Sequence, residues 1–478
     1  MKLLVRITGE MMLKSQAVSK RFQKQLLSNL KEAMKREEIP CKVLGQWSRI
    51  WLETEDKRVF EILNRVFGVH GYTLIEHECA ADLDVIVTEG ESFYKDIVRG
   101  KTFAIQANRC GVHNFTSVAV NQRLGSALNR HNAASMVRLK DPEITVHVEI
   151  RDDKAYFYRE TVKTRGGLPI GSAGHCLSLV SGGFDSTVAS WMMQKRGVKL
   201  HYLFCNLAGE SNEASVLNVM SHLIQKWGYG DYPRIHIVDF QPIVAEILKK
   251  VASPFSQVVL KRLFYKTAEM LARDLDSQGL ITGEAISQVS SQTLKNLQAI
   301  SSATTFPIYR PLVTFDKADI MQLAREIGVF EICSRIKEYC QIVPQKPVTA
   351  CSVEKAEKEE SYLDMSILEA QFAKRKVINL WDLDRLNLKQ TYLFKDSIPS
   401  DAVILDCQSE DQYKQWHHPD ATHYDFYDLL KEFSTLSKDK TYLIYCGVGT
   451  QSVVIAEKMQ AEGYEAFSLR GGVKSLEV

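Results

Sequence analysis

A strand-to-helix turn with two adjacent glycines gives the clearest chemical signal in the sequence. The apolar residues 177–180 are typical of a buried strand, and residues 187–194 are typical of the start of a helix. Between them, Gly182 and Gly183 allow the backbone to turn sharply and to approach a ligand closely. Peptide N–H groups in such a turn, with a helix N-terminus behind them, form an anion-binding site.

The side chains around these glycines indicate a phosphate ligand. Ser181 and Ser186 would add hydroxyl donors, and Asp185 would hold Mg²⁺ or orient a reacting group. A Walker A loop needs Gly-Lys-Ser/Thr after its last glycine, but Phe184 follows here. The stretch instead resembles the SGGxDS loop, or PP-loop, of the ATP pyrophosphatases. That resemblance implies that ATP binds here and that a substrate oxygen is adenylated; a purely structural Gly-Gly turn is the alternative.

A cysteine after a second apolar strand is the other candidate for chemistry. Cys446 follows residues 441–445 and opens a loop of small and polar residues, 447–452, that leads into a helix. Backbone N–H groups and a helix N-terminus would lower the pKa of this thiol and stabilise a persulfide. A buried, inert cysteine is the alternative.

The Cys446 pattern resembles the active-site loop of a rhodanese domain. Two positions that usually carry arginine in such domains hold other residues here, namely Gln408 and either Gln451 or Ser452. Arginine would bind the charge of thiosulfate, so the sequence favours a protein persulfide as the sulfur donor.

Composition limits the cellular setting. A chain of 478 residues is expected to hold about three domains, and its net charge of +2 provides no global field for nucleic acid. The ten cysteines include no Cys-x-x-Cys, and charged residues interrupt the N-terminus too early for a signal peptide. No apolar run is long enough to span a bilayer. A cytoplasmic protein without a membrane partner is expected.

The periodicity predicts a multidomain architecture of α/β and α+β units. Apolar residues spaced by four over residues 15–38 predict an amphipathic helix in a small N-terminal unit. Strands and helices alternate from residue 175 to about 350, which predicts a Rossmann-like parallel sheet. The expected divisions are an N-terminal unit at 1–56, a second α+β unit at 57–161, the α/β unit at 175–350, a connector at 351–399 and a further α/β unit at 400–478.

The order of these units resembles the tRNA 4-thiouridine synthetase family. The opening residues 6–10 resemble its ferredoxin-like cap, residues 145–158 resemble the end of a THUMP RNA-binding domain, and a rhodanese-like domain closes the chain. The resemblance implies ATP-dependent replacement of the O4 oxygen of a tRNA uridine, at position eight, by sulfur. It implies ATP and Mg²⁺ as cofactors and assigns no residue as a dedicated metal ligand.

The resemblance also implies roles for individual residues. Leu179 and Val180 would line the nucleotide base or ribose, and Gly283 and Gln292 would complete the pocket. Lys261 would contact the phosphates as a compact positive charge. The alternative is that Lys261 is a solvent-exposed charge on a helix surface. Lys317 would contact phosphate or the activated uridine oxygen. The full expected ATP-binding set is Leu179, Val180, Ser181, Gly182, Gly183, Ser186, Lys261, Gly283 and Gln292.

The remaining expectations concern sulfur and RNA. The resemblance implies that Cys340 forms a disulfide with Cys446 during turnover, which a reductant then resets. A PLP-dependent cysteine desulfurase would supply the persulfide, and a sulfur-carrier protein of thiamine biosynthesis would be a second acceptor. Arg123 and Arg130 are candidate phosphate contacts for tRNA. A homodimer is possible.

Two other functional classes stay open at this point. An iron–sulfur-dependent PP-loop thiolase would want three clustered cysteines, usually including Cys-x-x-Cys, and the sequence has no such motif. A non-catalytic tRNA-binding or sulfur-relay protein would not need an intact loop at residues 181–186.

Overall fold

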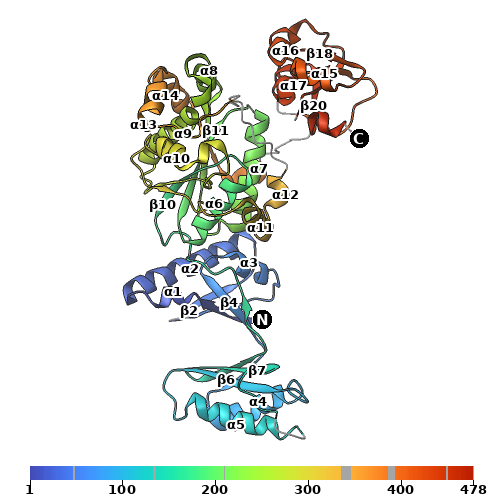
Figure 1. Ribbon diagram of the computed structural model, residues 1–478. Helices are drawn as coiled ribbons and strands as arrows, with labels where there is room; N and C mark the ends of the chain where they lie inside the picture. Colours follow the sequence, from blue (N-terminus) through green and yellow to red (C-terminus); the bar gives the residue numbers. More distant parts are fainter. Residues whose placement is uncertain are drawn as a thin grey trace. The chain divides into compact units, whose positions relative to one another are not determined.

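The computed structural model of the chain describes residues 1–46, 49–132, 136–208, 210–334, 346–385, 393–447 and 451–476 (Figure 1). The chain forms two compact units, residues 1–172 with 195–197 and residues 173–194 with 198–478. Within the described residues, every helix is too short or too polar to cross a membrane.

The first unit begins with a five-stranded antiparallel sheet and the long helix α2 (Gln16–Arg36). Of the five apolar residues with this spacing, Phe22, Leu26, Leu30 and Met34 are buried and Val18 is half-buried, which confirms the amphipathic helix. The sheet has the order β2-β3-β1-β4-β9, with β1 (Lys2–Ile7), β2 (Lys42–Gln46), β3 (Arg49–Glu53), β4 (Val69–Ile75) and β9 (Val162–Lys163). Because β4 pairs with β1, this sheet continues past the boundary expected at residue 56. Two shorter helices are α1 (Gly9–Met12) and α3 (Val59–Arg65).

A second, four-stranded sheet completes this unit. Its order is β5-β8-β7-β6, with β5 (His77–Ala80), β6 (Phe103–Cys110), β7 (Ile144–Arg151) and β8 (Lys154–Tyr158). Asp152 has a φ of 49° between β7 and β8, as expected for the predicted hairpin turn. Helices α4 (Leu83–Tyr94) and α5 (Ser117–Asn129) lie together beside the sheet and share its apolar core (Figure 1).

The second unit contains a six-stranded sheet of order β14-β13-β10-β11-β12-β15. The first five strands are parallel, as predicted, whereas β15 runs antiparallel at the edge. The strands are β10 (His175–Leu179), β11 (Lys199–Asn206), β12 (Arg234–Asp239), β13 (Leu280–Ile281), β14 (Ile308–Tyr309) and β15 (Lys376–Asn379). The helices between and around them are α6 (Phe184–Lys195), α7 (Glu210–Trp227), α8 (Gln241–Lys250), α9 (Ser256–Asp274), α10 (Leu294–Ser301), α11 (Lys317–Ile327) and α12 (Phe330–Cys333).

The segment expected to be a connector is largely part of this sheet domain. Helices α13 (Val353–Glu360) and α14 (Met365–Ala373) precede β15. Leu368 and Phe372 of α14 are buried in the same apolar core as Val259 of α9. Residues 351–379 therefore complete the sheet domain, because they supply both core side chains and an edge strand.

A separate parallel sheet forms the C-terminal part of the chain, in the order β16-β20-β19-β17-β18. Its strands are β16 (Phe394–Lys395), β17 (Val403–Asp406), β18 (Ala421–His423), β19 (Thr441–Tyr445) and β20 (Glu465–Leu469). Helices α15 (Glu410–Gln415), α16 (Phe426–Glu432) and α17 (Gln451–Ala461) accompany them. The parallel order brings the carboxyl ends of β17 and β19 to one edge of the sheet.

Candidate active site

The loop after β10 folds around the first turn of α6. The Ser181 N–H donates to the Ser186 hydroxyl over 3.2 Å, and the Thr187 hydroxyl donates to the Gly183 carbonyl over 2.9 Å. Gly182 has a φ of 77°, a left-handed conformation that residues with a side chain adopt only at a cost in free energy. The predicted order of strand, glycine loop and helix is therefore confirmed, with α6 beginning three residues earlier than expected.

A close approach between two segments fixes the position of this loop. A Cβ atom on Gly283, just after β13, would lie 2.5 Å from the backbone of Asp185 and of Ser186. No side chain fits in that space, so glycine at 283 allows the chain after β13 to pack directly against the loop. The sheet order places β13 next to β10, which brings these distant segments together.

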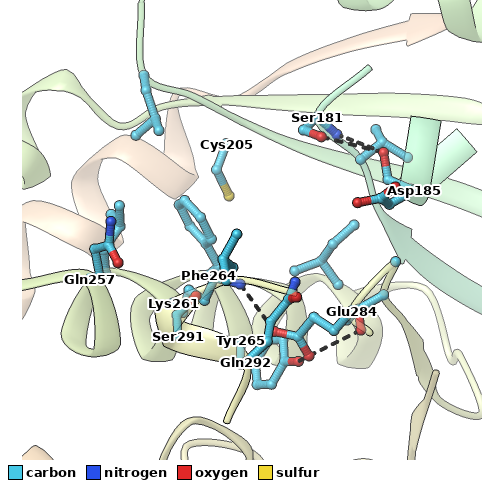
Figure 2. Close-up of a pocket in the computed structure, with 18 of the residues that line it drawn as sticks. Ser181, Asp185, Cys205, Gln257, Lys261, Phe264, Tyr265, Glu284, Ser291 and Gln292 are labelled. Carbon is cyan, nitrogen blue, oxygen red and sulfur yellow. Dashed lines mark hydrogen bonds and ion pairs between the residues drawn. The ribbon is translucent and has the colours of Figure 1, made fainter. Parts of the chain in front are cut away.

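A cavity of about 620 Å³ lies at the carboxyl ends of the strands, next to the loop. This volume falls in the range of small-molecule sites. In Figure 2, Ser181 and Asp185 lie on one side of the cavity and Lys261 and Gln292 on the other. Its apolar wall, suited to a nucleobase, includes Leu179, Leu203, Phe204, Leu260, Leu207, Phe264 and Val289.

Most of the ATP-binding residues expected from the sequence meet in this cavity. The lining includes Leu179, Val180, Ser181, Ser186, Lys261, Gly283 and Gln292 of that set, and also Asp185, which was expected to hold Mg²⁺ or orient a reacting group. Gly182 and Gly183 lie in the loop next to the lining residues Ser181 and Asp185.

Asp185 connects the loop to two further segments. Its carboxylate accepts from Lys317 Nζ at 2.8 Å, at the start of α11, and from the Gln288 side-chain amide at 2.7 Å. Lys317, expected near phosphate or uridine oxygen, thus touches a residue that lines the cavity. Gln288 was not among the expected site residues, because no local sequence pattern indicates that the segment after β13 lies next to Asp185.

Lys261 is held by a buried carboxylate, Glu284, with 3.3 Å between Nζ and Oε1. Glu284 also accepts from Arg310 Nε at 2.9 Å and from the Tyr265 hydroxyl at 2.6 Å (Figure 2 shows Lys261, Tyr265 and Glu284). Burial pushes the pKa of Glu284 upward, but the cations Lys261 and Arg310 outweigh it and lower the pKa overall. An ionised Glu284 positions the Lys261 ammonium at the cavity.

Two carbonyl oxygens in the cavity wall are buried without a hydrogen-bond partner in the described part of the chain. They are Gln288 Oε1 and Gln292 Oε1. A buried polar atom normally has a partner, so each is suited to accept a donor from a ligand, such as an exocyclic amine or a ribose hydroxyl. The donors and acceptors in this cavity fit a nucleotide.

Cys446 occupies an enclosed position after β19, with 1% of its surface exposed. The Ser452 hydroxyl donates to its sulfur over 3.7 Å, and this hydroxyl also pairs with that of Ser468 at 2.9 Å. A hydrogen bond from the Cys407 thiol, with others from Ser452 and the Gln451 N–H, lowers the pKa of Cys446 to about 5 despite its burial. The sulfur is therefore a thiolate at neutral pH. Cys407 is a neighbour that the sequence analysis did not identify.

The remaining expected residues have different outcomes. Cys340 lies outside the described residues, as does part of the Cys446 loop, residues 448–450. Arg123 and Arg130 lie on α5, and their guanidinium groups pair with Asp84 and Glu91 of α4 at 2.5 and 3.4 Å. Both arginine side chains remain at least half exposed. Groups of three or more potential metal ligands are absent from the described residues.

Four family models match consecutive parts of the chain. They are the ThiI ferredoxin-like domain at residues 2–73, the THUMP domain at 80–160, the thiamine biosynthesis protein (ThiI) at 171–365 and the rhodanese-like domain at 391–477. Their order agrees with the architecture expected from the sequence.

Two relatives that align over nearly the whole chain are named tRNA sulfurtransferase. The tRNA sulfurtransferase of Aliivibrio fischeri strain MJ11 is 36% identical over 475 residues, covering 97% of this chain and 98% of the relative. That of Desulfurococcus amylolyticus is 36% identical over 474 residues, covering 98% and 97%.

A solved structure matches most of the chain. A 4-thiouridine synthetase–RNA complex with bound ATP is 28% identical, with a TM-score of 0.66, and the match covers 79% of this chain and 98% of that one. Together with the nucleotide-sized cavity beside the Gly182–Gly183 loop and the thiolate at Cys446, the two relatives place the chain in the tRNA sulfurtransferase family.

Proposed function

We propose that the chain uses ATP to adenylate O4 of the uridine at position eight of tRNA, and then replaces that oxygen with sulfur carried on Cys446. The observation that carries the proposal is the cavity of about 620 Å³ that adjoins the loop at residues 181–186. The 4-thiouridine synthetase that this chain resembles was solved with RNA and ATP. Without activation, the O4 oxygen of uracil is a poor leaving group. Adenylation turns it into a good one, because AMP then leaves with it.

In the first step, three charged residues of this chain act on the phosphates and the uridine. Lys261 leaves Glu284 to contact the β,γ-phosphates, and the α6 N-terminus adds backbone donors. Lys317 stabilises the charge that develops near the uridine oxygen. Mg²⁺ would be held by Asp185 and would neutralise phosphate charge.

In the second step, Cys446 supplies sulfur. Its thiolate attacks the terminal sulfur of a persulfide on a cysteine desulfurase, the donor S–S bond breaks, and Cys446 becomes the persulfide. The terminal sulfur then attacks C4 of the uridine and AMP leaves. Cys340 attacks the inner sulfur, which forms a Cys340–Cys446 disulfide and releases 4-thiouridine. A dithiol reductant restores both thiols.

The proposal divides the work among the parts of the chain. The first two sheets, within residues 1–163, hold tRNA; residues 175–350 activate it; and residues 400–478 carry sulfur. The ThiI match supports transfer of sulfur to a carrier protein for the thiazole ring of thiamine as a second activity. These reactions belong in the cytoplasm, where tRNA and the desulfurase are found, and a homodimer is compatible with them.

The test is tRNA-dependent cleavage of ATP by the purified full chain. With unmodified tRNA and α-labelled ATP, we expect AMP and pyrophosphate to form only when tRNA is present. Asp185→Asn should lower that rate by roughly 10²-fold, the scale of losing one charged group at a phosphoryl site. Gln322→Ala, on the exposed side of α11, is the control. ATP cleavage into ADP, or no cleavage with tRNA, would refute the proposal.

A further inference from the structure

The C-terminal sheet places a second cysteine beside Cys446. Strands β17 and β19 are parallel and in register, with Asp406 opposite Tyr445. Cys407 and Cys446 are the next residue on each strand, and the Cys407 N–H donates to the Tyr445 carbonyl over 2.8 Å. Both side chains are 1% exposed and belong to the same apolar core. Neighbouring strand ends thus bring two sulfur atoms together inside the domain.

The two thiols have different protonation states. Burial raises the pKa of Cys407 well above its ordinary value, so Cys407 remains a thiol. Its S–H has two acceptors, the Tyr445 carbonyl at 3.2 Å and the sulfur of Cys446. A hydrogen bond to a charged acceptor is the stronger of the two, so the thiolate is the favoured partner.

Neutral groups surround this sulfur pair on the described elements. From α17, Ser452 contributes a hydroxyl and an N–H, and Ser468 of β20 supports that hydroxyl. The titratable group that acts on the pair is Asp406 at the end of β17, whereas the side chain of Tyr445 belongs to the core cluster on the other face of the sheet. Asp406 is engaged by the Gln408 N–H and side-chain amide at 2.9 and 3.0 Å. Among the described residues, the donors to the negative sulfur are therefore uncharged, and Cys407 is one of them.

We propose that Cys407 is a positioning residue for sulfur transfer, whose S–H donates to the Cys446 sulfur and keeps it anionic without a basic side chain. The inference rests on the proposed role of Cys446 as sulfur carrier. The same contact orients the Cys446 sulfur toward an incoming persulfide. Cys407 itself forms no covalent bond to the transferred sulfur.

The test is the pH dependence of Cys446 alkylation by iodoacetamide in the full chain, followed by peptide mass spectrometry. In the unsubstituted chain the rate should be half-maximal near pH 5, the pKa of Cys446. Removing the donor with Cys407→Ala should move that midpoint upward by roughly one to two pH units and slow alkylation at pH 5 about ten-fold. Cys407→Ser keeps a hydrogen-bond donor at this position, so its midpoint should lie close to that of the unsubstituted chain. If the substitution changed only the access of iodoacetamide to Cys446, the alkylation rate would change by the same factor at every pH and the midpoint would stay in place.

Further variants keep the test decisive. If Cys407→Ala does not fold, Cys407→Val, which fills the space in the core, should show the same upward shift of the alkylation midpoint. Cys176→Ala, which removes a buried cysteine from β10, should leave the midpoint unchanged. An unchanged midpoint in Cys407→Val would overturn the proposal, as would a Cys407–Cys446 disulfide formed on loading with inorganic polysulfide, because Cys407 would then be a nucleophile. The assay needs neither ATP nor tRNA, so its failure is distinct from failure of the proposed function.

Discussion

The loop at residues 181–186 and the loop at Cys446 both follow a parallel strand and precede a helix, but they surround their anions differently. The first adjoins a cavity of about 620 Å³ whose charged groups are already paired, Lys261 with Glu284 and Lys317 with Asp185. The second encloses a sulfur with 1% exposure among a thiol, hydroxyls and N–H groups. A large, multiply charged ligand needs space and cations that can change partners. A single anionic atom is stabilised by fixed neutral donors in a closed site.

This contrast predicts that the two reactions can be separated. Cys446→Ala should abolish 4-thiouridine formation completely, because no other described thiol shares its environment of donors. AMP formation with tRNA should continue at close to the normal rate, since the cavity residues are unchanged. Nucleoside mass spectrometry and release of labelled AMP measure the two outcomes. Normal 4-thiouridine in cells that carry this variant would refute the role of Cys446.

The close approach of Gly283 to the loop beside the cavity can be tested by adding a single methyl group at residue 283. Gly283→Ala places a Cβ 2.5 Å from the backbone of Asp185 and Ser186, so the loop must shift. Overpacking of this kind costs about 1–3 kcal/mol, and we expect ATP affinity to fall roughly ten-fold or more by calorimetry. Gly9→Ala, where a Cβ meets no atom within 4 Å, is the matched control. Equal affinities for the two variants would show that the close approach is not needed for binding.

The thiolate site should also make stability depend on pH. The pKa of Cys446 is about 5 in the folded chain and near 9 when unperturbed, so between these values only the unfolded chain holds the proton. Stability of the C-terminal sheet should therefore rise with pH from 5 to 9, by up to about 1.4 kcal/mol per pH unit, and this contribution is lost as pH falls through 5. Pulse proteolysis in urea, with peptides from residues 393–476 quantified, measures it. The slope should be smaller in Cys446→Ala and unchanged in Cys176→Ala.

The smallest effect is expected at the RNA contacts, because Arg123 and Arg130 are already paired with acidic residues. Reversing both charges should weaken tRNA binding several-fold and lower the slope of log affinity against log salt by about 1–2, the value for one or two phosphate contacts. Filter binding at several salt concentrations gives both quantities. If affinity falls with no change in slope, these arginines do not contact phosphate.

The sequence was most informative where neighbours along the chain create the chemistry. Gly182, Gly183 and Ser186 are adjacent, and so are Cys446 and the residues that follow it, so local pattern was enough to identify both loops. Gln288, Tyr265 and Cys407 could not be identified in this way. Gln288 and Cys407 reach their sites through strand order, as β13 lies beside β10 and β17 beside β19, and Tyr265 reaches Glu284 from helix α9. The antiparallel β15 was missed for the same reason, since edge pairing with β12 has no local sequence signature.

The edge strand β15 has a practical consequence for dissecting the protein. A fragment that ends at residue 350 or at residue 365 would lack β15 and also Leu368 and Phe372 of the core. The free backbone groups of β12, from Arg234 to Ile237, would then be open to pairing with another polypeptide. Such a truncated ATP-binding fragment is expected to aggregate on expression, whereas one extended through residue 385 would keep its sheet capped.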